Sequence, residues 1–245
     1  MAIYKYYVTD KKFSKTDNSM TETTFNYLFD FPDNSKKRFL IKLDAETIEY
    51  KPSNSTPPDW VLLGVARCTC CRLDLSTHDY CPIAANIADL VYAFKDTASH
   101  KSCKVSCIST ARTCSKETTV QEGLASIMGI IMATSGCPSM SILKPMACFH
   151  LPFATVEESM YRSVSAYLLR QFFSHQDGGY CDFFMHRIQE HYNEVQQVNE
   201  GILKRINMTS EMDADKNAIV TLNALAQILV MEVDEDLDSL KRMFS

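Results

Sequence analysis

The sequence is short of glycine, of long apolar runs and of net basic charge, and each shortage excludes a class of protein. Only seven of the 245 residues are glycine, and they do not form the glycine-rich loop that cradles phosphate groups. The longest apolar run, residues 124–133, is about half of the ~20 residues that a membrane span needs. Acidic side chains outnumber basic ones by 30 to 25. We therefore expect no membrane association, and the mild acidity argues against a nucleic-acid partner.

The first residues also lack the features of an export signal. Residues 1–12 carry a polar side chain at every second or third position, so they contain no apolar stretch of the length that a signal peptide requires. We expect a cytoplasmic protein. Cytoplasmic thiols stay reduced, so the ten cysteines are expected as metal ligands, reactive thiols or buried small side chains rather than as disulfides.

The first part of the chain predicts an antiparallel β meander. Apolar and polar residues alternate around Tyr4, Tyr6 and Val8, and further apolar runs follow near residues 25–29, 39–41 and 47–50. Prolines make residues 51–59 a loop. Beyond this loop we predict a strand at residues 60–66, and the alternation at residues 101–116 predicts a further strand or a hairpin.

Helical periodicity dominates the rest of the chain. Pro82 suits the first turn of a helix that has Cys81 at its N-terminal end. Thr119 with Glu122, and Thr155 with Glu158, match the capping box that begins a helix. Apolar residues at steps of three and four predict further helices at residues 180–206 and from about residue 213, with a short docking helix in the tail.

These elements predict an α+β fold in which an N-terminal antiparallel β meander packs on a C-terminal helical bundle. Residues 1–118 form the β-rich part, which includes the cysteine-containing loop and one helix. Residues 119–245 form the helical part. We expect the two parts to share one core, because a chain of 245 residues can bury roughly 70 to 75% of its unfolded surface as a single unit.

The most chemically suggestive stretch of the sequence is residues 68–82. Cys68 and Cys71 have the two-residue gap that lets neighbouring thiolates bind one metal ion, and His78 and Cys81 repeat this gap. These four side chains predict a tetrahedral zinc site. The loop between the two pairs is shorter than in common zinc modules.

A second assembly uses some of the same thiols. Cys81 and Cys137 are each followed by proline, and Cys68, Cys71, Cys81 and Cys137 would supply the four thiolates of an iron–sulfur cluster. The sequence leaves zinc and iron–sulfur open, with Cys137 or His78 as the fourth ligand. Inert thiols that pack as small apolar side chains are the third interpretation.

Two further functions compete with a metal centre. A small-residue ridge at Ala125, Gly129 and Ala133 and the long helix at residues 180–206 could form the interface of a homo-oligomer. A thiol enzyme could use Cys137 as nucleophile, His150 as base, and Glu157 or Glu158 to orient the base. Pro138 argues against the enzyme, because it offers no amide to stabilise an oxyanion.

Short motifs along the chain resemble an uncharacterised bacterial family classed as a domain of unknown function. They are the Cys68-x-x-Cys71 pair, Tyr80-Cys81-Pro82, Ser135-Gly136-Cys137-Pro138 and His150-Leu151-Pro152-Phe153. The resemblance covers most of the chain and implies a bacterial cytoplasmic setting. It implies no activity, so the function that we expect, a cysteine-bound metal centre, depends on ligand spacing alone.

Overall fold

The computed structural model describes residues 22–52, 57–209, 213–234 and 237–244. The strand predicted around Tyr4, Tyr6 and Val8 lies outside these residues. The elements follow one another as β1 (Glu22–Asp30), β2 (Lys36–Asp44), η1 (Asp59–Val61), α1 (Pro82–Phe94), β3 (Ser102–Ser109), β4 (Thr113–Thr119), α2 (Val120–Ala133), η2 (Pro138–Leu143), α3 (Lys144–Cys148), α4 (Val156–Gln176), α5 (Ile188–Asn207), α6 (Ala214–Asp234), α7 (Asp238–Lys241) and η3 (Arg242–Phe244).

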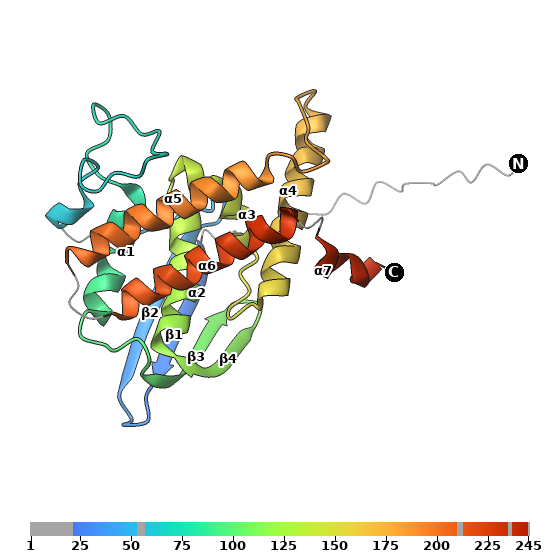
Figure 1. Ribbon diagram of the computed structural model, residues 1–245. Coiled ribbons are helices and arrows are strands. Elements are labelled where there is room, and N and C mark those ends of the chain that lie inside the picture. The colour runs from blue at the N-terminus through green and yellow to red at the C-terminus, as the bar shows by residue number, and fades with distance from the viewer. Residues whose placement is uncertain (1–21, 53–56, 210–212, 235–236, 245) are drawn as a thin grey trace, which may run out of the picture.

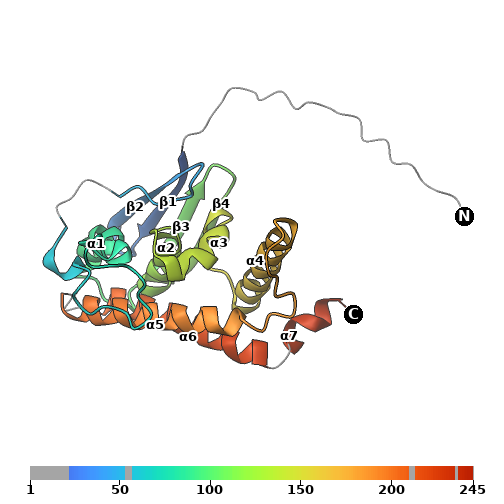
Figure 2. The same ribbon diagram turned by 90° about the horizontal axis from the view of Figure 1, so that it is seen from above.

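The molecule is layered, as Figure 2 shows from above. The sheet forms one side, α1 and α2 lie against it, and α5 and α6 form an outer helical layer that packs on α2. Helix α4 stands beside these layers, and α7 contacts it (Figure 1). The predicted α+β fold, with an antiparallel sheet followed by helices, is confirmed.

The sheet is antiparallel in the order β2-β1-β3-β4. Alternate residues of β1 point to the helices, and Phe25, Tyr27 and Phe29 are buried there. Tyr27 pairs with Cys107 on β3 and Phe29 with Val105, so the buried side chains of neighbouring strands lie in one row. One face of the sheet therefore supplies the core, as the period-2 alternation requires.

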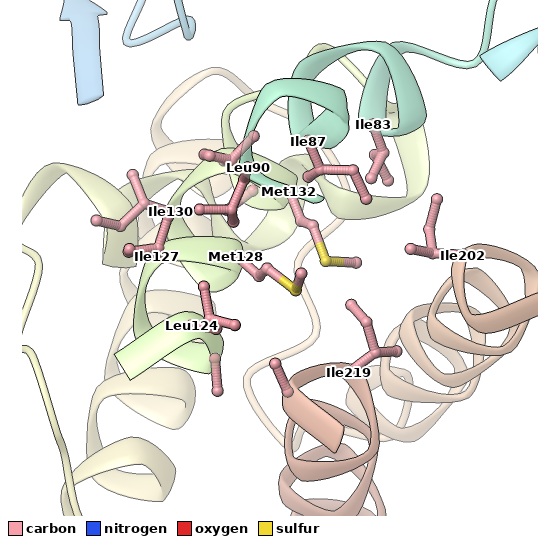
Figure 3. Packing of buried hydrophobic residues seen from close by; sticks show 14 of the residues in the cluster. Ile83, Ile87, Leu90, Leu124, Ile127, Met128, Ile130, Met132, Ile202 and Ile219 are labelled. Carbon is pink, nitrogen blue, oxygen red and sulfur yellow. The ribbon is translucent and has the colours of Figure 1, made fainter. Parts of the chain in front are cut away.

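Helix α2 lies at the centre of the core. Ten of its fourteen residues are buried, and they are found on all sides of the helix, as expected for a helix enclosed between two layers. Gly123 allows the close approach to the sheet, because a Cβ there would come within 2.5 Å of the Phe29 ring. Figure 3 shows how side chains of four helices meet around α2; they are Ile83, Ile87 and Leu90 of α1, Leu124, Ile127, Met128, Ile130 and Met132 of α2, Ile202 of α5 and Ile219 of α6.

The strand predicted at residues 60–66 is wrong. Residues Asp59–Val61 form a 3-10 turn, and the single bridge in this region joins Leu62 to Tyr80. Arg205, which is fully buried on α5, binds the backbone carbonyl groups that would otherwise accept hydrogen bonds from a neighbouring strand. Its guanidinium donates to the carbonyls of Trp60, Leu62 and Leu63 at 2.7, 2.8 and 3.2 Å.

Of the two predicted capping boxes, the one at Thr155 and Glu158 is present and the one at Thr119 and Glu122 is not. Thr119 is the last residue of β4, and carbonyl groups of residues 99 and 101 accept the first amides of α2. Glu122 instead accepts hydrogen bonds from Thr118 and Lys116. The continuous passage from strand to helix replaces the side-chain cap.

The helix predicted at residues 180–206 begins later than expected, at Ile188. The carboxylate of Asp182, which is buried, accepts hydrogen bonds from the backbone amides of His186 and Arg187 and from the Tyr167 hydroxyl. These bonds hold the preceding segment as a turn against α4. The residues predicted as a strand at 47–50 are also a turn, with a single bridge between Leu43 and Tyr50.

By length and apolar composition alone, α6 could cross a bilayer over Ala214–Val233, and the bent pair of α2 with residues Pro138–Cys148 passes the same test as one span. In the structure α6 packs against α2 and α5. Core helices of soluble proteins have the same composition.

Candidate metal centre

The predicted cysteine ligands begin in a long irregular loop, residues 62–81, between η1 and α1. Connections of more than about 12 to 15 residues without regular structure are uncommon in compact domains and usually carry function. Arg205 fixes the start of the loop through three backbone carbonyls. The amide of Cys81 fixes its end by donating to the carbonyl of Val61 at 2.8 Å. The middle of the loop is half-buried or exposed.

Cys68 and Cys71 lie at the two ends of a tight turn, in which the Cys71 amide donates to the Cys68 carbonyl at 3.1 Å. This turn rests on α5, where the Cys68 thiol lies 4.0 Å from the carbonyl oxygen of Val198. Gly201 makes the contact possible, because a side chain there would overlap the Cys68 sulfur. The loop is thus packed on α5 through its sulfur-bearing turn.

Cys81 and Cys137 occupy equivalent positions in their own segments. Each is the N-cap of a helical element, Cys81 of α1 and Cys137 of η2, and each is followed by a proline in the first turn. The backbone amide of Met140 donates to the carbonyl of Cys137 at 3.1 Å, and the Cys137 amide donates to Ser135 Oγ at 3.3 Å. Amide donors and helix N-termini stabilise a thiolate.

The four predicted thiols come from three separate segments, and those of Cys71, Cys81 and Cys137 lie within electrostatic range of the Cys68 thiol. The thiol of Cys68 interacts electrostatically with those of Cys81, Cys70, Cys137 and Cys71, and the thiol of Cys137 interacts with those of Cys81 and Cys71. All of these cysteines are free thiols. Within the described part of the chain, however, no group of three or more His, Cys, Asp or Glu side chains is arranged around a point where a metal ion would sit.

Burial governs the protonation of this cysteine cluster, by which we mean Cys68, Cys70, Cys71, Cys81 and Cys137. Burial, with a smaller contribution from the charges of neighbouring thiols, raises the pKa of Cys68 to about 12 and that of Cys137 to about 11. Without a cation to offset the negative charge, these two sulfurs are protonated at neutral pH. They become thiolates when a metal ion replaces the protons.

His78 lies in an exposed part of the loop. Its side chain is exposed and its Nδ1 forms a 2.8 Å hydrogen bond with the Thr77 hydroxyl. Cys70, which sequence spacing does not single out, lies in the same turn as Cys68. Its thiol is 3.6 Å from the Glu194 carbonyl oxygen and accepts a hydrogen bond from the Ser139 hydroxyl at 3.9 Å. Of the two predicted candidates for the fourth ligand, Cys137 is the one near Cys68.

The residues of the predicted thiol enzyme are engaged elsewhere. His150 Nε2 is hydrogen-bonded to the Tyr27 hydroxyl at 2.5 Å. Glu158 caps α4, and Glu157 pairs with Arg242. Among the described residues, no hydrogen bond joins Cys137 to His150.

The chain belongs to the family described as a domain of unknown function, DUF6901, whose model matches residues 25–245. The predicted resemblance to an uncharacterised family is therefore confirmed. Comparisons with curated proteins and with solved structures give no match. The family description carries no activity, so the roles of the cysteines depend on the chemistry of the cluster.

Proposed function

We propose that Cys68, Cys71, Cys81 and Cys137 hold one metal centre, either a zinc ion or an iron–sulfur cluster, in a cytoplasmic protein. The observation that carries the proposal is that the Cys68 thiol lies within electrostatic range of the other three. They come from a loop, the start of α1 and the start of η2, and the charge of each of the other three acts on the Cys68 thiol. Four thiolates are a complete ligand set for either kind of centre.

The surroundings of the thiols favour a bound cation. Four thiolates so close together repel one another unless a positive ion offsets their charge. Cys68 and Cys71 lie on the half-exposed part of a loop that is anchored at both ends, so their sulfurs can close around an ion while the helix-capping Cys81 and Cys137 stay in place. Cys70 would then remain outside the ligand set, held by Ser139.

A centre with four protein ligands suits structural support or electron transfer. Hydrolytic metal sites keep one coordination position open for water or substrate, whereas closed four-thiolate sites do not. The centre would join the loop to the first turns of α1 and η2, and thereby fix three segments that are distant in the sequence. Zinc would supply structural support alone, and an iron–sulfur cluster would also carry an electron.

The test is metal analysis of the full-length protein purified without oxygen. We expect either about one zinc per chain with no visible colour, or iron and sulfide with broad absorption near 400 nm. Cys71→Ser and Cys137→Ser should each lose more than half of the metal and melt at a lower temperature, because ligand loss removes binding energy that stabilises the fold.

Cys181→Ser is the matched control, because Cys181 lies near His175 and away from the cluster. It should keep the metal content of the unchanged protein. A protein that contains neither zinc nor iron when purified in this way contradicts the proposal. Full metal retention in Cys137→Ser would remove Cys137 from the ligand set.

Self-assembly is the second candidate function. The small-residue ridge is a poor candidate for its interface, and α4 with the segment after it is a better one. The small-residue ridge is covered from within the chain, because Ala125 and Ala133 are buried and a Cβ on Gly129 would lie 3.8 Å from Leu222 of α6. Sedimentation of the purified protein at micromolar concentration tests it, and a strict monomer would contradict self-assembly. The exposed apolar side chains gather instead on α4 and the segment after it, and they are Leu169, Phe172, Phe173, Tyr180, Phe183 and Phe184.

A further inference from the structure

A second site lies between α2, α3, α4, α5 and α6, where the helices leave a cavity of about 420 Å³. Small-molecule sites in proteins are typically about 300 to 1,000 Å³ and mostly apolar. Apolar side chains dominate the lining of this cavity. Four of them belong to methionine, whose flexible side chain adapts to the shape of a ligand; they are Met132, Met140, Met146 and Met160.

Ser126 and His150, which line the cavity, form a neutral polar cluster with the fully buried Tyr27. The Tyr27 hydroxyl forms hydrogen bonds with Ser126 Oγ at 2.8 Å and with His150 Nε2 at 2.5 Å. Burial lowers the pKa of His150 to about 3, and burial raises the pKa of Tyr27 well above its usual value. Both groups are therefore uncharged at neutral pH, and they add no charge to the cavity.

Arg162 on α4 supplies the unbalanced charge of the lining. Its Nη2 donates to the carbonyls of Met146 and Phe149 at 2.7 and 3.1 Å. A guanidinium has five N–H donors in all, so others remain available. Glu158, an acidic neighbour whose charge acts on Arg162, is engaged in the cap with Thr155.

Arg162 is half-buried, and no ion pair joins it to a carboxylate among the residues that the structure describes. The other charged residues of the lining, Lys116 and Glu122, pair with each other at 3.2 Å. The lining thus carries one net positive charge, which is available to an anionic group of a ligand.

Asn199 on α5 is the second unsatisfied group of the lining. It is 1% exposed, and both polar atoms of its side chain lack a hydrogen-bond partner in the described part of the chain. A buried polar group without a partner costs about 1 to 3 kcal/mol. Two turns of α5, or about 10 Å, separate Asn199 from Tyr192, and both line the cavity together with Arg162.

We infer that this cavity binds an amphipathic carboxylate: a carboxyl group pairs with Arg162 and an acyl chain lies along the methionine-lined interior toward Asn199. With Nη2 engaged, Arg162 can still offer a carboxylate charge-assisted hydrogen bonds from its Nε and Nη1. The apolar lining gains from removing the chain from water. A hydroxyl group at the far end of the chain would satisfy Asn199. The inference is independent of the metal centre, because none of the four proposed ligands lines the cavity.

The test compares three ligands on the full-length protein, with binding followed by calorimetry. Decanoate should bind at least tenfold more tightly than 1-decanol, because only decanoate offers a charge to Arg162. We expect 10-hydroxydecanoate to bind more tightly than decanoate. Equal affinity of decanoate and 1-decanol, or no binding of any of the three at 1 mM, would overturn the inference without reference to any variant.

Variants then locate the ligand. Arg162→Gln should lower decanoate affinity at least tenfold and leave 1-decanol affinity unchanged, and Asn199→Leu should abolish the preference for the hydroxylated chain. Arg170→Gln is the matched control, because Arg170 is an exposed arginine on the same helix. Thermal melting without ligand shows whether each variant is folded. Loss of affinity in Arg170→Gln equal to that in Arg162→Gln would place the carboxylate elsewhere.

Discussion

At the scale of single residues, the environment of the Asp215 carboxyl group is unusual. It lies in the first turn of α6, it is 1% exposed, and neither of its oxygens has a hydrogen-bond partner among the described residues. Burial raises its pKa from 3.8 to about 7, although Lys37 opposes the change. A carboxyl group held in this way is protonated in the folded protein at pH values where it is ionised in the unfolded chain.

Stability should therefore fall as the pH rises through this range. Between the unfolded pKa of 3.8 and the folded pKa of about 7, the folded state binds the extra proton, so the contribution of Asp215 is full below pH 4 and lost by pH 7. The loss amounts to roughly 4 kcal/mol of unfolding free energy. We expect Asp215→Asn to flatten this pH dependence and to raise the free energy of unfolding at pH 8.

Urea unfolding at pH 5 and pH 8 measures the effect. Glu46→Gln, in an exposed turn after β2, is the control and should follow the unchanged protein at both pH values. If Asp215→Asn is as pH-dependent as the unchanged protein, Asp215 is not the group that titrates.

Among the cysteines, sequence spacing identified the cluster but not its limits. The CxxC gap and the two Cys-Pro pairs selected Cys68, Cys71, Cys81 and Cys137. The charges of the last three act on the Cys68 thiol, and their joint binding of a metal stays a prediction. His78 has the right gap from Cys81 but lies in an exposed turn with Thr77. The buried partners that matter most to the loop, Arg205 and Gly201, are more than a hundred residues away, so no local pattern could reveal them.

At the scale of elements, helix α2 offers a matched pair of glycines. A Cβ on Gly123 would meet the Phe29 ring at 2.5 Å, whereas a Cβ on Gly129 would meet Leu222 at an ordinary 3.8 Å. Gly123→Ala should destabilise the protein by about 1 to 3 kcal/mol through overpacking. Gly129→Ala should stabilise it by roughly 0.5 to 1 kcal/mol, because alanine is the better helix former.

Chemical unfolding of the two variants under identical conditions measures both effects. Because the two positions lie on the same helix, helix propensity alone would shift both variants in the same direction. Opposite signs are therefore the expected result, and a stabilised Gly123→Ala would mean that α2 does not lie as close to the sheet as described.

Elements with strong local signals were predicted, and elements that depend on distant partners were not. Pro82 with its apolar stripe, the capping box at Thr155 and the alternation of residues 101–116 correspond to α1, α4 and the β3–β4 pair. The segment at residues 60–66 is an apolar run of strand length but is no strand, because the Arg205 guanidinium, and not a neighbouring strand, donates to its carbonyls. Periodicity describes burial, and it does not say which group satisfies the backbone.

At the scale of the whole molecule, the two predicted parts are joined in three ways. β4 runs directly into α2 at residues 119 and 120, α2 packs against the sheet, and Arg205 from the helical part holds the loop of the first part. The division of the chain into two parts at residue 118 stays a prediction. These contacts favour unfolding as one cooperative unit.

The single tryptophan makes this testable, because Trp60 lies where Arg205 anchors the loop. Trp60 fluorescence and helical circular dichroism should give the same thermal midpoint. If the protein holds the proposed metal, its removal with a chelator should lower both midpoints together, since a ligand that binds only the folded state stabilises all of it. A fluorescence transition at a clearly lower temperature would show that the loop melts separately.

The short helix η2 has one end in each of the two proposed sites. Cys137 is its N-cap residue, its Ser139 hydroxyl donates to the Cys70 thiol, and the amide of Met140 donates to the Cys137 carbonyl. The side chains of Met140 and Leu143 line the cavity. A shift of η2 that favours one occupant must alter the site of the other. Thermodynamic linkage then requires reciprocity: whatever factor the metal imposes on carboxylate affinity, the carboxylate imposes on metal affinity.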